Sequence, residues 1–547
     1  MAEILQKNQT YTFTVESLCG NGNGVAKHFG FVVFIPNTAP GDVVRAKLIK
    51  LTKSYGVGKL ESVLTPSPER AESGCPVAGK CGGCGFWHIS YEAESKIKRA
   101  MIDDAFERIA HIPLRASDYL AAKEPTRYRN KVIYPVGTDK EGKLIAGFYA
   151  PSSHRIVPHD DCPIGPEIFA KIRDAVLSVC SEHAVSAYDE TSGKGLLRGI
   201  YMRIGDDEKV LLTLIINGAS LGKEAERALC EALPSVFPTL CGILLNENTN
   251  AGNGVLGERF RTLWGQSFLA VSLCGRRFRV SPDAFFQVNP AQTERLYRTA
   301  CAFADVKEGD TLFDLYCGTG TIGILAAKAG VKLYGVEIEK AAAENAAENA
   351  RENGVEGRFL CLDAGEALDS DRLKNLLPDV IIIDPPRKGC GAEAAERIAA
   401  LGAKRIVYIS CNPQTLARDL VTFAERGYDA KKAVGVDLFP RTGHVETVVL
   451  LSKGEIDSKK VRVEFSLEDM DMSEFQDGAT YPQIKEYVLE HTGLKVSNLY
   501  ISQIKRKCGL EVGKNYNLPK SEDSRQPQCP PEKEKAIREA FKYFGMI

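Results

Sequence analysis

The sequence predicts a multidomain α/β protein built around a doubly wound parallel sheet. Between about residues 280 and 453, short apolar runs that end in polar, Gly or Pro residues alternate with helical stretches such as KAAAENAAENARENG. Residues 1–66 instead alternate apolar and polar positions between Gly-rich turns, which is typical of a small β-barrel. The length of 547 residues corresponds to three or four domains at roughly 100–200 residues each.

These patterns divide the chain into four expected domains. They are an OB-like β-barrel at 1–66, an α+β central domain at 67–275, a doubly wound, Rossmann-like domain at 276–455 and a small, mostly helical extension at 456–547. In the central domain, residues 91–112 predict a helix, because Ile102, Phe106 and Ile109 recur at helical spacing. The run GVDLFPRTGHVETVVLLSK predicts a hairpin that closes the large sheet.

The extension contains signals for two helices. The first, TYPQIKEYVLEHTG, has Thr480 as its N-cap and Pro482 in its first turn. The second, VSNLYISQIKRKCG, starts at Ser497 and stops at Gly509, with the basic run 505–507 at its end. Two interpretations stay open, a helix-turn-helix that binds RNA and an interaction or folding cap.

Composition indicates a cytoplasmic protein. No apolar run reaches the roughly 20 residues of a membrane span, and the first residues lack the basic stretch and apolar core of a secretory signal. In a reducing compartment the 16 cysteines are not expected to form disulfides. Four of them, in apolar surroundings, are expected to be core residues: Cys230, Cys241, Cys274 and Cys361.

A Gly-rich turn follows the first strand of the doubly wound domain. In DLYCGTGTIGI, the strand ends at Asp314 and glycines at 318, 320 and 323 allow close approach to a ligand. Glu337 ends the next strand, where an acid suits ribose hydroxyls. A structural turn or a dinucleotide site are the alternatives, but the acidic Asp314 before the turn would repel a pyrophosphate and suits the ammonium end of S-adenosylmethionine. Together with DPPR at 384–387, the pattern favours an S-adenosylmethionine-dependent methyltransferase.

Cys411 lies between a predicted strand, RIVYIS, and a predicted helix, QTLARDLVTFAERG. Asn412 is placed to cap this helix and Pro413 to occupy its first position. The helix N-terminus favours thiolate over thiol, and ligands of α/β proteins bind at this edge of the sheet. A thiolate that adds to carbon 6 of uracil makes carbon 5 nucleophilic, so that it can accept a methyl group. The alternative is a buried structural cysteine.

Residues 1–453 resemble the bacterial (uracil-5-)-methyltransferases of 23S ribosomal RNA, in the iron–sulfur branch that carries an N-terminal TRAM domain. The matching motifs are SPDAFFQVN, DLYCGTGTIGI, the strand ending in Glu337, DPPRKG, SCNPQTLARDL and PRTGHVET. The resemblance implies that Cys411 is the nucleophile and Glu446 the base that removes the carbon 5 proton. It also implies four residues that contact the cofactor or help form the active site: Gln287, Tyr316, Glu337 and Asp384. Without the motif, Glu446 would be interpreted as a surface acid.

Four cysteines form a candidate metal site. Cys75, Cys81 and Cys84 cluster in C-x5-C-x2-C, and Cys162 follows in HDDCPIG. Three clustered thiolates and a distant fourth suit a [4Fe–4S] cluster, and a four-cysteine zinc site is the alternative from spacing alone. The resemblance favours iron–sulfur, in a structural or RNA-holding role.

The expected partner is ribosomal RNA, bound by a monomer. The net charge of −1 means that any phosphate-binding surface must be local. Candidates are the lysines of the barrel (Lys47, Lys50, Lys53 and Lys59) and the extended segment with Arg127, Arg129 and Lys131. The target uracil must be single-stranded or flipped out, since a helix hides carbon 6. The alternatives are a transfer RNA uracil-5-methyltransferase and a non-catalytic RNA-binding assembly factor.

Overall fold

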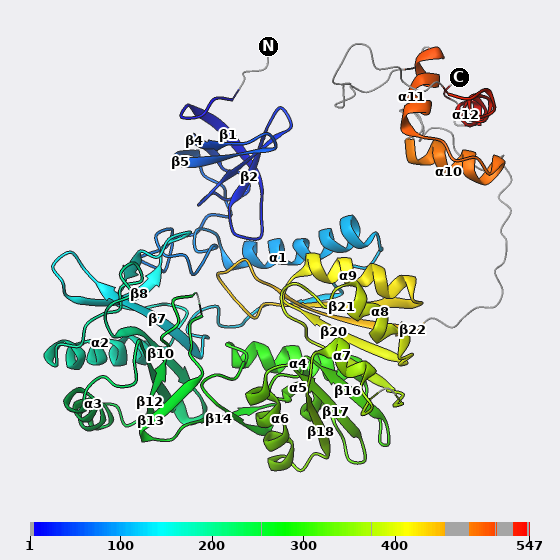
Figure 1. Cartoon of the computed structure of the whole chain (residues 1–547). Coiled ribbons are helices and arrows are strands. Elements are labelled where there is room, and N and C mark those ends of the chain that lie inside the picture. The colour runs from blue at the N-terminus through cyan, green and yellow to red at the C-terminus, as the bar shows by residue number, and fades with distance from the viewer. Residues whose placement is uncertain are drawn as a thin grey trace. The chain divides into compact units, whose positions relative to one another are not determined.

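The computed structural model describes residues 5–252, 254–373, 375–453, 481–508, 510, 529–543 and 546 (Figure 1). The chain forms two compact units, Met1–Ile456 and Asp457–Ile547, which are described separately.

The first unit begins with the predicted β-barrel. Its strands are β1 (Thr10–Leu18), β2 (Gly24–His28), β3 (Phe31–Ile35), β4 (Val43–Leu51) and β5 (Tyr55–Thr65). They close in the order β1-β2-β3-β5-β4. Alternate positions such as Phe13 and Val15 point into the barrel core, which accounts for the alternating sequence pattern.

A long helix, α1 (Tyr91–Ala105), follows the cysteine-rich segment and continues as a π-helical turn, η1 (Phe106–Ala110). Ser90 caps α1 by accepting a hydrogen bond from the amide of Ala93. Ile102 and Phe106 are fully buried, as the helical spacing predicts. Ile109 is 38% exposed, because the π turn rotates it away from the core.

The central domain is a seven-stranded sheet in the order β13-β12-β11-β10-β7-β8-β9. The strands are β7 (Lys131–Thr138), β8 (Leu144–Tyr149), β9 (Ile156–Pro158), β10 (Leu197–Ile204), β11 (Val210–Ile216), β12 (Leu240–Glu247) and β13 (Arg259–Gly265). Helices α2 (Glu167–Glu182) and α3 (Lys223–Val236) pack on one face. Val132, Tyr134 and Val136 of β7 point toward these helices, whereas Ile133 and Pro135 point to the other face.

The doubly wound domain is an eight-stranded sheet in the order β18-β17-β16-β19-β20-β22-β21-β6. The strands are β6 (Asp118–Leu120), β16 (Thr311–Leu315), β17 (Lys332–Glu337), β18 (Gly357–Cys361), β19 (Val380–Ile383), β20 (Arg405–Ser410), β21 (Tyr428–Val436) and β22 (Glu446–Lys453). β21 and β22 form the predicted hairpin. β6 pairs with β21, so the sheet also includes a segment from outside residues 276–455.

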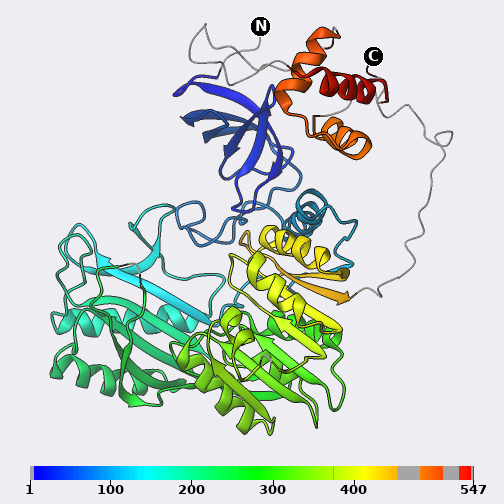
Figure 2. The same ribbon diagram turned by 45° about the vertical axis from the view of Figure 1, so that its right-hand side comes forward.

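Helices cover both faces of this sheet (Figure 1 and Figure 2). They are α4 (Pro290–Ala304), α5 (Thr321–Ala326), α6 (Lys340–Glu352), α7 (Ala364–Asp369), α8 (Ala392–Ala400) and α9 (Pro413–Glu425). Phe313 and Ile381 belong to one core, and their neighbours Leu312 and Ile382 belong to the other. A short hairpin, β14 (Leu269–Leu273) with β15 (Arg276–Val280), precedes α4. Together these elements form a Rossmann-like domain.

The second unit contains α10 (Tyr481–Thr492), α11 (Asn498–Lys507) and α12 (Pro531–Tyr543). Ser497 caps α11 as expected, through the amide of Tyr500. The expected cap Thr480 and stop Gly509 lie outside the described residues. The sequence patterns did not predict α12. Its residues Ile537 and Phe541 are fully buried in the core of this unit.

One expectation about the cysteines is wrong. Cys361 is exposed, and Cys230, Cys241 and Cys274 are only partly buried. Cys361 ends the edge strand β18, where an apolar sequence neighbourhood does not guarantee burial. Of the helices that the structure describes, none has the length and apolar character needed to cross a membrane.

Candidate active site and cysteine pocket

The Gly-rich turn after β16 holds the carboxylate of Glu337 by backbone hydrogen bonds. The amide of Gly318 donates to Oε2 of Glu337 at 2.9 Å, and the amide of Glu339 donates to Oε1 at 2.9 Å. Tyr316 and Gly318 both have positive φ, of 64° and 54°, so the chain turns sharply at the strand end. Glu337 is therefore fixed at the carboxyl edge of the sheet, as the sequence predicts.

Asp314 lies fully buried beneath the same turn. Its Oδ2 accepts a hydrogen bond of 2.8 Å from the amide of Gly323, and its Oδ1 has no partner. A Cβ at position 323 would come within 2.7 Å of Oδ2, so this close approach requires glycine. Burial, together with the charges of Asp384 and Glu337, raises the pKa of Asp314 to about 7. A cationic ligand beside this group would be favoured.

Gln287 and Asp384 lie around the hydroxyl of Tyr297, on α4. The Tyr297 side chain forms hydrogen bonds with Thr321 and Gln287, and its pKa is raised by burial and by the charge of Asp384. Burial also raises the pKa of Asp384 to about 7. Gln287, Asp314, Glu337 and Asp384 thus surround one region at the carboxyl edge of the sheet. Tyr316 lies beside a different group, with Cys390, Asp363 and Asp419 near its hydroxyl.

Cys411 follows β20 and begins the turn into α9. Asn412 caps α9 by accepting a hydrogen bond of 3.1 Å from the amide of Gln414, and Pro413 occupies the first helical turn, as predicted. Ser410 of β20 is the register partner of Thr447 in the antiparallel strand β22. One step further along both strands, Cys411 therefore lies opposite Glu446.

The structure does not support the expected stabilisation of the Cys411 thiolate. Burial, together with the charges of Glu446 and Asp384, raises the pKa of Cys411 to about 11. Arg387 is the nearby charge that lowers it. Burial and two carboxylates therefore outweigh the favourable dipole at the start of α9.

Glu446 is not a surface acid. Its side chain is buried at the start of β22, and the residue is 3% exposed. Burial raises its pKa well above the ordinary value, Asp384 raises it further and Arg387 lowers it. Cys411, Glu446 and Asp384 thus interact electrostatically in one site, with Arg387 as the compensating cation. A buried carboxyl of raised pKa beside a thiol is a candidate general base.

Arg387 and His444 contact each other at this site, with 3.2 Å between Nη2 and Nε2. Burial, together with the cations Arg387, Lys98 and Arg129, lowers the pKa of His444 to about 4. His444 is therefore neutral near pH 7, and its Nε2 can accept the Arg387 hydrogen bond. The sequence identified both residues within motifs but indicated no role for either.

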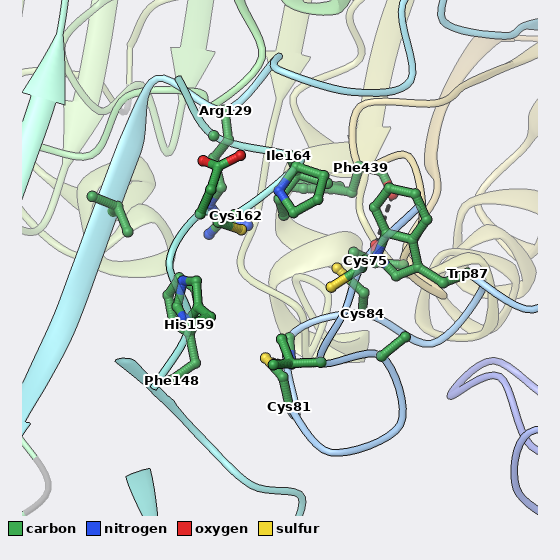
Figure 3. Close-up of a pocket in the computed structure, with 18 of the residues that line it drawn as sticks. Cys75, Cys81, Cys84, Trp87, Arg129, Phe148, His159, Cys162, Ile164 and Phe439 are labelled. Carbon is green, nitrogen blue, oxygen red and sulfur yellow. Dashed lines mark hydrogen bonds between the residues drawn. The ribbon is translucent and has the colours of Figure 1, made fainter. Parts of the chain in front are cut away.

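The four predicted metal ligands line one cavity of about 450 Å³ (Figure 3). Cys75, Cys81 and Cys84 come from the loop before α1, and Cys162 comes from the loop before α2. Burial raises the pKa of Cys84 to about 12, and Cys162 contributes to the shift. Arg387 and His444 line the same cavity, so the cysteine pocket adjoins the site of Cys411 and Glu446.

The cysteine pocket lacks the geometry of a single-ion site. Throughout the described ranges, no three His, Cys, Asp or Glu side chains are grouped closely enough to hold one metal ion. A zinc ion would bind its four sulfur atoms at about 2.3 Å each. Four cysteine thiolates around one cavity are also the ligand set of a four-iron cluster.

A buried ion network joins α1 to the loop that leads into Glu446. Nζ of Lys98, fully buried, donates to Glu94 at 2.7 Å, to Asp437 at 2.8 Å and to the carbonyl of Phe439 at 3.0 Å. The backbone amide of Arg441 donates to Glu94 at 2.7 Å. The sequence does not predict this network, because Glu94 and Lys98 have the i, i+4 spacing of an ordinary surface ion pair on a helix.

Arg441 connects the same loop to the cysteine segment. Its carbonyl accepts hydrogen bonds from the amides of Gly85, at 3.0 Å, and Phe86, at 3.1 Å, directly after Cys84. Its guanidinium lies over the ring of Trp87, 5.0 Å from the centroid. The segment that carries three of the four cysteines is thus hydrogen-bonded to the segment that precedes Glu446.

Only part of the basic segment 127–131 is free for phosphate contacts. Arg127 has a φ of 55°, and its guanidinium bonds Asp161 and the carbonyl of Gly165, so it is not one of three aligned cations. Arg129 and Lys131 do line the cysteine pocket. Burial lowers the pKa of Lys131 to about 8, with Arg203 and Arg129 lowering it further.

Comparison with known proteins places this architecture in a family. A TRAM domain model matches residues 5–60, and the model described as tRNA (Uracil-5-)-methyltransferase matches residues 266–454. An uncharacterized RNA methyltransferase of Oceanobacillus iheyensis is 38% identical over 451 residues, covering 82% of this chain and 97% of that protein. The chain belongs to this family of TRAM-containing uracil-5-methyltransferases. An uncharacterized RNA methyltransferase of Listeria monocytogenes is also 38% identical, over 82% of this chain and 99% of that protein.

A solved structure of the family has the same fold. The tRNA (uracil-54, C5)-methyltransferase of Pyrococcus abyssi, in complex with S-adenosyl-L-homocysteine, is similar with a TM-score of 0.66 and 26% identity. The match covers 80% of this chain and 99% of that chain. The chain is therefore an S-adenosylmethionine-dependent RNA methyltransferase with an N-terminal TRAM barrel and a Rossmann-like catalytic domain.

Proposed function

We propose that this enzyme transfers a methyl group from S-adenosylmethionine to carbon 5 of a uracil in 23S ribosomal RNA, with Cys411 as nucleophile and Glu446 as base. The observation that carries the proposal is the pairing of these two residues at the ends of β20 and β22. A thiol opposite a buried carboxyl of raised pKa provides both groups that carbon 5 chemistry needs.

The reaction begins with addition of the Cys411 sulfur to carbon 6 of the uracil. The electron pair of the 5,6 double bond moves toward the carbonyl at carbon 4, and carbon 5 then attacks the sulfonium methyl. S-adenosylhomocysteine leaves, and carbon 5 carries both its proton and the new methyl group. Glu446 takes that proton, the 5,6 double bond re-forms and the Cys411 thiolate leaves.

The methyl donor occupies the carboxyl edge of the sheet in this proposal. Glu337 is placed to accept hydrogen bonds from two ribose hydroxyls, and Gln287 and Asp384 complete the pocket, while Tyr316 contributes through the sharp backbone turn at the end of β16. The positive charge of the bound sulfonium compound would lower the pKa of Cys411, opposing the effect of its two neighbouring carboxylates.

The cysteine pocket is proposed to hold a [4Fe–4S] cluster through Cys75, Cys81, Cys84 and Cys162. The shared cavity and the absence of a single-ion arrangement among the described side chains support this choice over zinc. Such a cluster would connect the loop before α2 to the segment bonded to Arg441, and so stabilise the wall that Arg129 and His444 form beside the active site.

Transfer RNA is the second candidate substrate. The description of the matching family model names tRNA as the substrate, and the Pyrococcus abyssi relative acts on a tRNA uracil. The resemblance of residues 1–453 to the 23S ribosomal RNA enzymes, which includes the four-cysteine set, supports ribosomal RNA. Mapping 5-methyluridine in both RNA classes, from cells with and without the gene for this protein, decides the question. A 5-methyluridine lost only from 23S ribosomal RNA supports the proposal, and one lost only from tRNA replaces it with the second candidate.

A further inference from the structure

A second groove crosses the face of the central sheet that α2 and α3 leave uncovered. It has a volume of about 720 Å³ and is lined by open-face residues of β7, β10 and β11, including Ile133, Pro135 and Ile215. Ile133 and Phe148 line both this groove and the cysteine pocket. The central groove therefore adjoins the cysteine pocket, which in turn is lined by Arg387 and His444.

Two stacked pairs of planar side chains line the groove. The rings of Tyr149 and His154 stack with centroids 5.0 Å apart and planes 14° from parallel. The guanidinium of Arg198 lies over the ring of Tyr188, 4.3 Å from its centroid. Nucleobases stack on such aromatic and guanidinium planes whatever their sequence.

The charges of the groove suit an RNA backbone. Arg198 donates to the carbonyls of Asn248, at 2.7 Å, and Asn250, at 2.8 Å, so its partners are neutral. Arg155 is exposed, and no carboxylate among the described residues forms an ion pair with it. Two acids oppose them: Glu190 is engaged by His154 and by the hydroxyl of Tyr149 at 3.3 Å, and Asp189 accepts a hydrogen bond of 2.7 Å from the amide of Ser192. The two arginines are therefore free to attract phosphates.

We infer that this groove binds single-stranded nucleotides that flank the target uridine, by stacking on Tyr188 and Tyr149 and by phosphate contacts with Arg155 and Arg198. The inference rests on the RNA-binding function of the enzyme and adds a subsite to it. The groove determines how long a single-stranded segment the enzyme prefers, whereas the reaction itself takes place beyond the cysteine pocket.

The test measures binding of single-stranded, uridine-containing RNA to the full-length protein by fluorescence anisotropy. An oligomer of about three nucleotides fills the reaction centre alone, and one of about twelve also reaches the groove. Wild-type protein should bind the longer RNA more tightly. Tyr188→Leu should weaken binding of the longer RNA by about tenfold and leave the shorter one unchanged.

Arg155→Gln changes a surface residue and so leaves the fold intact. It should reduce the slope of log affinity against log salt for the longer RNA by about 0.7, the value for one phosphate of a single strand. Arg227→Gln is the matched control, because Arg227 is exposed on α3, on the opposite face of the sheet. Its slope should equal that of wild type.

Unchanged binding of the longer RNA by both groove variants would overturn the inference. Equal affinity of wild type for the two lengths would also overturn it, while leaving the proposed methyl transfer intact. Failure of the wild type to bind either RNA would instead count against the proposed function.

Discussion

Cys411 and Glu446 lie opposite each other at the ends of the antiparallel strands β20 and β22, one step beyond the paired residues Ser410 and Thr447. Residues opposite each other in such a ladder have Cβ atoms about 5 Å apart. The sheet therefore brings together the proposed nucleophile and the proposed base, which belong to different strand ends. Glu446 raises the pKa of Cys411, Asp384 raises the pKa of both groups, and Arg387 lowers the pKa of both.

The pKa of Cys411 should respond to its charged neighbours. The pKa of Cys411 is about 11. Below that pH, the rate of Cys411 alkylation by iodoacetamide should increase about tenfold for each unit by which the pH is raised, because only the thiolate reacts. At about pH 9, Glu446→Gln removes a negative charge and should speed alkylation by about tenfold, while Arg387→Gln should slow it. Peptide mass spectrometry measures the rate at each cysteine.

Exposed Cys361 serves as the internal control, since its alkylation should be the same in all three proteins. Identical rates at Cys411 in wild type and both variants would show that the three charges are not coupled.

The buried network around Lys98 should make a large contribution to stability. Lys98→Met leaves Glu94 and Asp437 buried without their cation, which should cost about 3–5 kcal/mol in the free energy of unfolding. Lys96→Met, two residues away on α1, removes only an exposed pair with Glu92 and should leave the unfolding midpoint unchanged. Urea denaturation compares the two variants, and equal midpoints would refute the assigned importance of the network.

Protein purified without oxygen should contain about four irons per chain. Cys84→Ser should lose this iron, because Cys84 lines the cysteine pocket, whereas Cys361→Ser should retain it, because Cys361 lies outside. Elemental analysis together with visible absorption measures the content. One zinc ion per chain with no iron would contradict the proposed cluster.

The extension should add RNA affinity without contributing to the chemical step. Its core, which includes Ile484, Ile501 and Ile537, is built from its own residues, so its removal leaves the first unit packed. Deletion of residues 461–547 should weaken RNA binding and lower its salt dependence, with the single-turnover rate of methyl transfer retained. Lys507 forms an ion pair with Glu534 at 2.6 Å, so Arg506 is the better residue to substitute in a single-site test of RNA binding. Unchanged affinity across a salt series favours an interaction or folding cap.

The sequence predicted the local elements around the site well. The strand before Cys411, the cap Asn412, the first-turn Pro413 and the strand-ending Glu337 all depend on neighbouring residues, and the structure has them as expected. The burial of Glu446 could not be predicted from its neighbours in the sequence, because it depends on strands β20 and β21, which pair with β22 on either side.

Electrostatic interactions between residues that are distant in the chain could not be predicted from the sequence. The helix N-terminus predicts a lowered pKa for Cys411, but the opposing carboxylates of Asp384 and Glu446 arrive from other strands. Likewise Lys98 has the i, i+4 spacing of a surface pair with Glu94, and its second partner, Asp437, is 339 residues away. Neither the raised pKa of Cys411 nor the buried network of Lys98 could be predicted, because a local sequence pattern does not show which charges the fold brings together.

The covalent mechanism assigns different roles to Cys411 and Glu446, and the two variants should fail differently. Cys411→Ala should bind S-adenosylmethionine but form no adduct with RNA. Glu446→Gln keeps the shape of the side chain but cannot accept the carbon 5 proton, so sulfur should add, the methyl group should transfer and the reaction should then stall.

The most direct measurement is therefore a denaturing gel of Glu446→Gln after incubation with RNA and S-adenosylmethionine labelled in the methyl group. The mechanism predicts a protein–RNA adduct that survives denaturation and carries the label, and none with Cys411→Ala. Turnover by Glu446→Gln at the wild-type rate, without an adduct, would contradict the assignment of Glu446 as the base.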